Sequence, residues 1–271
     1  MFVGVIFCVI LVLLYFKFKN YVPILMYHRI ANVPGDRNSL PEEKFEEQLK
    51  FLAENNYTTI TSDMLYEHYT KHKPLPKKSV MLTFDDGYND NYTKALPLLQ
   101  KYNMKAVVFP IYNWIGKPNK WENFGKKETT TMTQEELHSW LKAGMDIQPH
   151  TLNHPFLTEC KDEELEKEIL NSKQGFEKLL DKPMNYLCYP YGFFDKRVIE
   201  VVKKADYKMA FAIFDNVSLW HINLFTLPRI PIPSHQKMWE FKLKVSSINV
   251  IFVAMRKWER DFKRFRRKIY K

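Results

Sequence analysis

SVMLTFDDGYNDN, residues 79–91, ends a run of apolar residues in two adjacent acids and a glycine. The segment VMLTF (80–84) predicts a buried strand, and Gly87 permits a tight turn after Asp85 and Asp86. Two neighbouring carboxylates repel each other unless a cation lies between them or one of them keeps a proton. The stretch therefore predicts a strand end at which some other group must balance the charge of this pair.

Apolar segments like this one alternate with amphipathic ones along the chain. Further strands are expected in VPILMYHRI (22–30), AVVFPI (106–111), MDIQP (145–149), NYLCYP (185–190), MAFAI (209–213) and LPRIPI (227–232). Helical patterns lie between them, and the pair Thr133 and Glu136 predicts a capping box at the start of one helix. Because the strands are apolar almost throughout, we expect an α/β fold whose parallel sheet is covered on both faces or closed as a barrel.

Polar residues gather at the expected carboxyl ends of these strands. Asp85 and Asp86 end one strand, His150 follows another, and Tyr191 lies in the loop after a third. Ligands of parallel α/β folds bind at this edge. The positions therefore predict one shared site.

Two histidines and an acid at this edge form a set of metal-ligating residues. His150 and His154 lie in HTLNHP (150–155), and an aspartate from the neighbouring strand end completes three ligands, which leaves a position open for water. Taken alone, the histidine pair is more often structural, and an isolated DDG is more often a turn acid and a helix cap. Together they favour a metal, with one aspartate as ligand and the other accepting a proton from water.

These motifs identify a family resemblance. TFDDGY (83–88) and HTLNHP (150–155) resemble the first two motifs of the polysaccharide deacetylases, carbohydrate esterase family four, and YPYG (189–192) is similar to the third. The resemblance covers roughly residues 22–232. It implies a distorted (β/α) barrel of about seven parallel strands. It also implies metal-dependent hydrolytic removal of acetyl groups from glycans.

The same resemblance implies roles for individual residues. Asp85 resembles the general base, and the metal ligands, usually of zinc, would be Asp86, His150 and His154. The backbone N–H of Tyr191 would stabilise the tetrahedral oxyanion.

The chain departs from the common family pattern in two places. CYPYG (188–192) lacks the arginine that braces the base in many members, and Arg229 is the candidate for that position, although it could equally be a surface residue. For the general acid, His221 in LWH fits a late family motif. His28 in LMYHRI is favoured because it follows a strand and resembles the branch that deacetylates poly-β-1,6-N-acetylglucosamine in biofilms.

Aromatic residues after the strand AVVFPI are candidates for stacking on sugar rings. They are Tyr112, Trp114, Trp121 and Phe124. Packing within the loop is the alternative interpretation. Tyr191 and Trp114 are the predicted substrate contacts.

The net charge of +10 is concentrated near the C-terminus. Residues 256–271 carry nine Lys and Arg against two acids, which leaves about +3 for the remainder and argues against a nucleic-acid-binding groove. Residues 244–271 predict a basic amphipathic helix, for an anionic surface or for docking on the barrel. The three cysteines show no disulfide or CxxC pattern, and Cys188 is expected to be a buried small apolar residue.

The apolar segment at residues 1–20 predicts a membrane anchor, with a buried first element as the alternative. The predicted catalytic domain, residues 21–243, would then be extracellular. We expect it to remove N-acetyl groups from a cell-surface or extracellular glycan, in particular an N-acetylglucosamine polymer. Peptidoglycan, O-acetylated polysaccharide and an inactive carbohydrate-binding relative are the alternatives.

Overall fold

The computed structural model describes residues 22–120, 129–213 and 223–246. The chain divides into two compact units, one of residues 24–236 and the other of residues 1–23 and 237–271. In the second unit the structure describes the short helix α8 (Met238–Val245). No helix within these ranges is long and apolar enough to span a bilayer. The predicted anchor at 1–20 and most of the predicted helix at 244–271 lie outside them.

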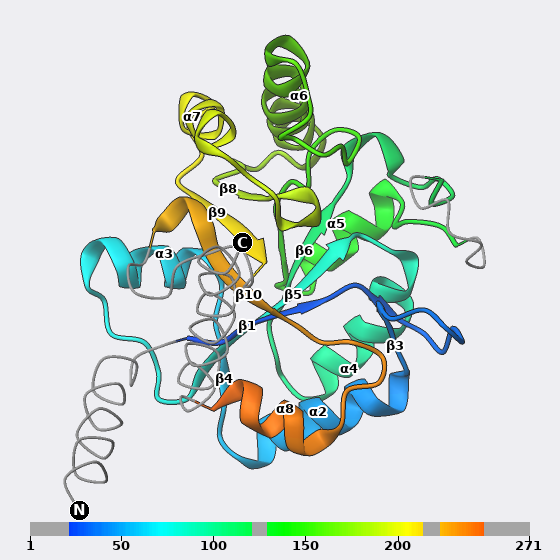
Figure 1. The fold of residues 1–271 in the computed structure, drawn as a ribbon. Coiled ribbons are helices and arrows are strands. Elements are labelled where there is room, and N and C mark those ends of the chain that lie inside the picture. The colour runs from blue at the N-terminus through cyan, green and yellow to red at the C-terminus, as the bar shows by residue number, and fades with distance from the viewer. Residues whose placement is uncertain (1–21, 121–128, 214–222, 247–271) are drawn as a thin grey trace, which may run out of the picture. The chain divides into compact units, whose positions relative to one another are not determined.

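The first unit is built on one curled parallel sheet (Figure 1). Seven strands follow one another across it in the order β7-β6-β5-β1-β10-β9-β8, and every pairing is parallel. The α/β class and the distorted barrel are confirmed. The strands are β1 (Ile24–Tyr27), β5 (Ser79–Asp86), β6 (Val107–Pro110), β7 (Asp146–Ile147), β8 (Tyr186–Cys188), β9 (Met209–Ile213) and β10 (Leu227–Pro231).

Helices surround this sheet on its outer side (Figure 1). They are α2 (Glu42–Glu54), α3 (Ser62–Lys71), α4 (Leu96–Lys101), α5 (Gln134–Lys142), α6 (Asp162–Leu180) and α7 (Lys196–Lys204). The predicted capping box at the start of α5 is confirmed, because the hydroxyl of Thr133 accepts from the Glu136 N–H and the Glu136 carboxylate accepts from the Thr133 N–H. Residues 91–95 form a π-helical turn before α4, where the sequence predicts an ordinary helix.

Three further strands have two residues each, and the sequence predicted only Arg29–Ile30, as the end of the expected strand segment 22–30. β2 (Arg29–Ile30) pairs with β3 (Ser39–Leu40), and β4 (Thr58–Thr59) pairs with the first residues of β5. Two-residue strands carry too little periodicity to be recognised.

Burial explains why β5 is apolar up to its two acids. All eight of its residues are buried, and Phe84 packs against Tyr27, Phe45 and Trp140 with ring centroids 5.4, 5.7 and 6.1 Å away. A strand that is covered along its whole length must be apolar at consecutive positions. Its last residues, at the carboxyl edge, are the exceptions.

The two edge strands of the sheet, β7 and β8, approach each other just beyond β7. The N–H of Cys188 donates to the Pro149 carbonyl at 3.1 Å, and the side-chain oxygen of Gln148 accepts from the Asn185 and Tyr186 N–H groups at 3.2 and 3.1 Å. A side chain thus supplies part of the pairing that a regular barrel makes through its backbone. This approach brings the loop after β7 next to the end of β8.

The turn after β5 requires a glycine. Gly87 has φ +67°, and a Cβ at this position would lie 2.7 Å from the Pro110 Cβ. Only glycine combines this backbone conformation with so close an approach to β6. The predicted tight turn is therefore confirmed.

Candidate metal centre

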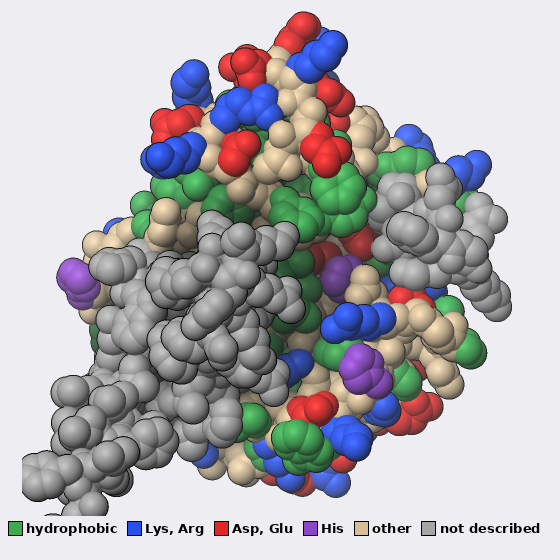
Figure 2. All heavy atoms as spheres, viewed as in Figure 1, with side chains coloured by type: hydrophobic (Ala, Val, Ile, Leu, Met, Phe, Trp, Pro, Cys, Tyr) green, Lys and Arg blue, Asp and Glu red, His purple; other side chains and the backbone are tan. Residues whose placement is uncertain are grey.

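Four polar side chains predicted from the sequence meet at the carboxyl end of the sheet. Asp85 and Asp86 end β5, and His150 and His154 lie in the loop after β7. All four are buried, with exposed fractions of 2–8%. Figure 2 shows a hollow near the middle of the drawn face, with acidic and histidine side chains inside it and hydrophobic side chains along one edge.

Asp86, His150 and His154 are spaced as the ligands of one small cation would be. Asp86 Oδ1 lies 3.7 Å from His150 Nε2 and 3.5 Å from His154 Nε2, and the ligand atoms of the three lie within 4.8 Å of one another. Ligand atoms about 2.1 Å from a tetrahedral zinc ion lie about 3.4 Å apart. One carboxylate and two imidazoles at this spacing fit such an ion.

The surroundings of the two histidines keep them in the form that binds metal. The carbonyl of Cys188 lies 2.8 Å from His150 Nδ1 and can only accept, so that nitrogen carries the proton and Nε2 presents its lone pair to the site. Burial lowers the pKa of His150 to about 4. Burial, followed by the neighbouring His150, holds the pKa of His154 well below its ordinary value. Both imidazoles are therefore neutral at neutral pH.

Asp85 is held by an arginine from the other half of the sheet. Arg229, in β10, donates two hydrogen bonds of 2.5 and 2.8 Å to the two carboxylate oxygens. Burial raises the pKa of Asp85, but the charge and hydrogen bonds of Arg229 outweigh burial and hold that pKa well below its usual range. Asp85 is therefore ionised, and Arg229 balances the charge of this member of the acid pair.

Arg229 is fully buried, which excludes the surface position considered as its alternative. Its guanidinium also lies 5.4 Å from the centre of the Phe109 ring. The side chain brings a fixed positive charge to the carboxylate that the family resemblance identifies as the base.

His28 faces the same carboxylate. Its Nε2 lies 3.9 Å from Asp85 Oδ2, with 18% of the side chain exposed. The backbone around it is fixed, because the Asn91 amide donates to the His28 carbonyl at 2.7 Å. Asp90 in turn accepts from Arg29 and from the Ile30 N–H at 3.0 and 2.9 Å. The alternative acid, His221, lies outside the described residues.

Cys188 was not predicted as a site residue. It is fully buried as expected, but its Sγ lies 3.8 Å from Asp85 Oδ1, and it forms a second possible ligand group with Asp85 and His150. Burial holds the pKa of the thiol well above its ordinary value, so the group remains protonated. The sequence feature that could have indicated Cys188 as a site residue is its position at the end of β8, directly before YPYG.

Glu168 of α6 was also missed. Its Oε2 accepts from the N–H groups of Leu152 and Asn153 at 3.0 and 2.9 Å, and its Oε1 accepts from the Asn153 amide at 2.6 Å. The carboxylate therefore anchors the loop that carries both histidines. The signal was an acid on the buried face of α6, beside Leu165 and Ile169.

Tyr191 lies in a strained turn at the edge of the centre. Its φ is 55°, and Gly192 follows with φ +68° in a position where a Cβ would meet Ile213 at 2.4 Å. Its ring lies 4.5 Å from that of His154. The role predicted for the Tyr191 N–H stays a prediction.

Left-handed backbone recurs among the site residues. Asp86, Thr151, His154 and Tyr191 have φ values of 70, 67, 65 and 55°. Such angles cost free energy in residues other than glycine and concentrate at functional sites. They also direct consecutive side chains away from ordinary strand alternation, so Asp85 and Asp86 can serve one site.

The predicted aromatic contacts have different surroundings. Tyr112 packs edge-on against Phe176 of α6 with centroids 5.2 Å apart, as a packing residue does. Trp114 is half-buried in the short 3-10 segment Tyr112–Trp114, and its contact with substrate stays a prediction. Trp121 and Phe124 lie outside the described residues.

Known proteins match this chain in sequence and in fold. The profile of the polysaccharide deacetylase family matches residues 72–210, just over half of the chain. The Bacillus subtilis protein YxkH, whose name refers to the same family, is 29% identical over 211 residues, covering 78% of this chain and 71% of that protein. The poly-β-1,6-N-acetyl-D-glucosamine N-deacetylase of Staphylococcus aureus is 28% identical over 223 residues, covering 79% and 74%.

The fold has close counterparts among solved structures. The Streptococcus pyogenes deacetylase PplD, solved with acetate, superposes with a TM-score of 0.73 over 83% of this chain and 98% of that one, at 24% identity. The chain belongs to the polysaccharide deacetylase family. The predicted family is thus confirmed, and with it the class of enzyme, a polysaccharide deacetylase.

Proposed function

We propose that the protein is a metal-dependent N-deacetylase of an extracellular or cell-surface polymer of N-acetylglucosamine. The observation that carries the proposal is the convergence of Asp86, His150 and His154 beside a second, ionised carboxylate. A divalent ion held by those three residues, most simply zinc, would supply Lewis-acid chemistry by polarising the acetyl carbonyl and acidifying water.

Asp85 takes the proton from the attacking water in this proposal. Arg229 keeps it ionised and fixes its orientation through both oxygens. A carboxylate with a depressed pKa is a weak base towards bulk water, so it suits a water that has already been acidified.

His28 and Tyr191 act on the other atoms of the acetamide. The His28 Nε2 lies 3.9 Å from Asp85 Oδ2, and as the imidazolium His28 protonates the leaving nitrogen. The Tyr191 N–H, in its left-handed turn, donates to the oxygen on which charge develops. The products are acetate and a free amine on the glycan.

The choice of substrate is supported by the named relative in Staphylococcus aureus, of which this chain covers 74%. Similarity at 28% identity leaves peptidoglycan and O-acetylated polysaccharide as competing substrates. A location at the cell surface, with residues 1–20 as an anchor, completes the proposal. Fractionation of cells that carry the chain with and without residues 1–20 tests it, because loss of the segment should release the protein from the membrane fraction.

Acetate release from a panel of glycans, with and without a chelator, tests the function. We expect release from poly-N-acetylglucosamine that stops on chelation and returns with Zn²⁺. Asp85→Asn should retain metal and glycan but lose acetate release, because the amide cannot accept the proton. A wild-type protein that binds glycan and metal yet releases no acetate from any substrate would show an inactive carbohydrate-binding protein instead.

A further inference from the structure

A row of aromatic side chains leads outward from the metal ligand candidate His154. The ring of Tyr191 lies 4.5 Å from His154, and the ring of Phe156 stacks on Tyr191 at 4.0 Å with the planes 11° apart. Phe193 follows, 6.1 Å from Phe156. Phe156, Tyr191 and Phe193 are called the aromatic ladder below.

The aromatic ladder is exposed, although its rings are large and apolar. The exposed fractions of Phe156, Tyr191 and Phe193 are 40, 37 and 45%. Among the large hydrophobic residues in the described ranges, only Leu170 and Trp239 are as exposed. Single exposed apolar residues are ordinary, whereas a contiguous group beside a polar centre marks a binding surface.

The turns that build the metal centre also set the positions of these rings. Phe156 follows His154 by two residues, and His154 has a left-handed backbone. Tyr191 and Phe193 flank Gly192, which no larger residue can replace because of Ile213. The aromatic ladder is therefore continuous with the centre and held by the same backbone.

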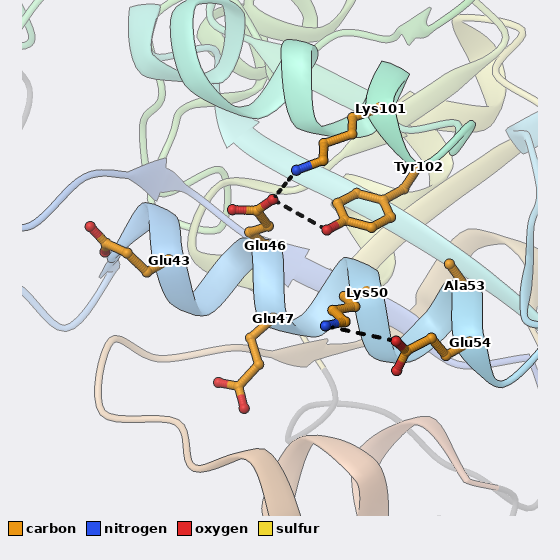
Figure 3. A pocket seen from close by; sticks show the side chains of 8 residues that line it. All are labelled: Glu43, Glu46, Glu47, Lys50, Ala53, Glu54, Lys101 and Tyr102. Atoms are coloured by element: carbon orange, nitrogen blue, oxygen red, sulfur yellow. Dashed lines mark hydrogen bonds and ion pairs between the residues drawn. The ribbon is translucent and has the colours of Figure 1, made fainter.

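Another hollow, between α2 and α4, lacks such features. It is a groove of about 550 Å³ in which both lysines of the lining pair with glutamates (Figure 3). Glu46 accepts from Lys101 and Tyr102 at 2.6 and 3.2 Å, and Lys50 lies 3.8 Å from Glu54. Surface pairs of this kind contribute little and indicate no ligand.

We propose that the aromatic ladder binds a sugar unit of the glycan chain next to the unit that is deacetylated. A pyranose ring presents flat faces of C–H groups with hydroxyls at its rim, and aromatic rings offer the matching flat apolar surface. The ladder's rings carry no formal charge, which suits a neutral N-acetylated sugar. The inference rests on the proposed function, because it places this sugar by its distance from the metal centre.

Binding beyond the reacting unit makes the reaction depend on chain length. An extra stacked sugar contributes binding free energy that can be used in the transition state, so kcat/KM should rise from the monomer to the pentamer of N-acetylglucosamine. Phe156→Ala and Phe193→Ala should each reduce the ratio of pentamer to monomer kcat/KM about tenfold, the order expected for one lost aromatic contact. Phe156→Leu, which keeps an apolar side chain but removes the ring, should show most of that loss.

Leu170→Ala is the matched control, because Leu170 lies on α6 and is as exposed as Phe156. It should leave the ratio unchanged. Thermal unfolding of each variant verifies that the folded state is retained. An unchanged ratio in both phenylalanine variants would overturn the proposal.

Binding without turnover separates this inference from the proposed function. Calorimetry with metal-stripped protein and the pentamer should give an affinity that falls about tenfold in Phe156→Ala and Phe193→Ala but not in Leu170→Ala. Equal affinities in all variants would overturn the ladder even if the enzyme released acetate. If the affinity falls in this way while no glycan yields acetate, the result supports glycan binding by the aromatic ladder and contradicts the proposed function. If Phe156→Ala and Phe193→Ala bound neutral lipid vesicles less well than the wild type but bound the glycan equally well, the aromatic ladder would be a membrane-binding surface instead.

Discussion

Asp85 and Asp86 are neighbours in the chain and equally buried, but their charges meet different partners. Asp85 accepts two hydrogen bonds from Arg229, a group that is always charged. Asp86 faces His150 and His154, whose pKa values burial keeps low, so neither imidazole carries a charge at neutral pH. The comparison teaches that the charge of Asp85 is neutralised by a side chain of the protein itself, whereas Asp86 is suited to bind a cation from solution.

Removal of a proposed ligand on the Asp86 side should have the largest effect. His150→Ala leaves two of the three ligands, and we expect acetate release to fall at least about 1000-fold, or about 4 kcal/mol in the barrier. Bound zinc, measured by elemental analysis, should fall with it. His235→Ala, at an exposed histidine, is the control and should change neither. Full metal content in His150→Ala would contradict the proposed ligand set.

Removal of the cation on the Asp85 side should affect stability rather than metal content. Arg229→Met leaves a buried carboxylate without its counter-ion, and the expected loss is about 3–5 kcal/mol in the free energy of unfolding. The double variant Arg229→Met with Asp85→Asn should recover much of it, which urea unfolding can measure as a coupling energy. If Arg229→Met lost its zinc while it kept its stability, the two carboxylates would not differ in the way described.

Acid should destabilise the metal-free protein through the histidine side. The pKa of His150 is about 4 in the folded protein and about 6.5 in the unfolded chain, so the unfolded state binds more protons between these values. Stability is therefore full above pH 6.5 and falls as the pH drops towards 4, by about 3 kcal/mol for this residue. Unfolding in chelator across this range measures the slope, which His150→Asn should reduce. A flat profile in the wild type would contradict neutral, buried imidazoles.

The smallest effect is expected at the carboxylate that anchors the histidine loop. Glu168→Gln keeps an acceptor for the Leu152 and Asn153 N–H groups but loses the bond from the Asn153 amide. We expect zinc affinity to weaken about tenfold, as for other residues that orient metal ligands. Glu164→Gln, at an exposed position of the same helix, should have no effect. Equal affinities would limit Glu168 to a structural role.

Sequence patterns predicted the elements well where the pattern is long. β5 and β9 are mostly apolar at successive positions, and α6 repeats its buried apolar residues at helical spacing. The tight turn at Gly87 and the cap at Thr133 follow from local chemistry and were also predictable. The order of the strands follows from the expected barrel, in which successive strands are neighbours and the last strand, β10, lies beside the first, β1. The opening between β7 and β8 was not predictable, because no local pattern encodes it.

The partners of the site residues were harder to predict than the residues themselves. Arg229 lies 144 residues from Asp85 in the chain. The sequence offered it as the arginine that braces the base and equally as a surface residue, and only the fold decides between the two. Cys188 and Glu168 resemble ordinary members of a strand and a helix, and their relevance comes from neighbours elsewhere in the sequence. The left-handed backbone of Asp86 could not be predicted from the residue type, because aspartate adopts this conformation only occasionally, whereas glycine adopts it routinely.

The central place of β1 has a consequence for biosynthesis. Its four residues are among the first of this unit to leave the ribosome, yet one neighbour, β10, ends at residue 231. Until that segment emerges, one edge of an apolar strand stays open to aggregation and to chaperones. Asp85 at the end of β5 obtains its guanidinium partner at the same late moment, so the nascent chain cannot complete this buried ion pair before residues 227–231 have emerged.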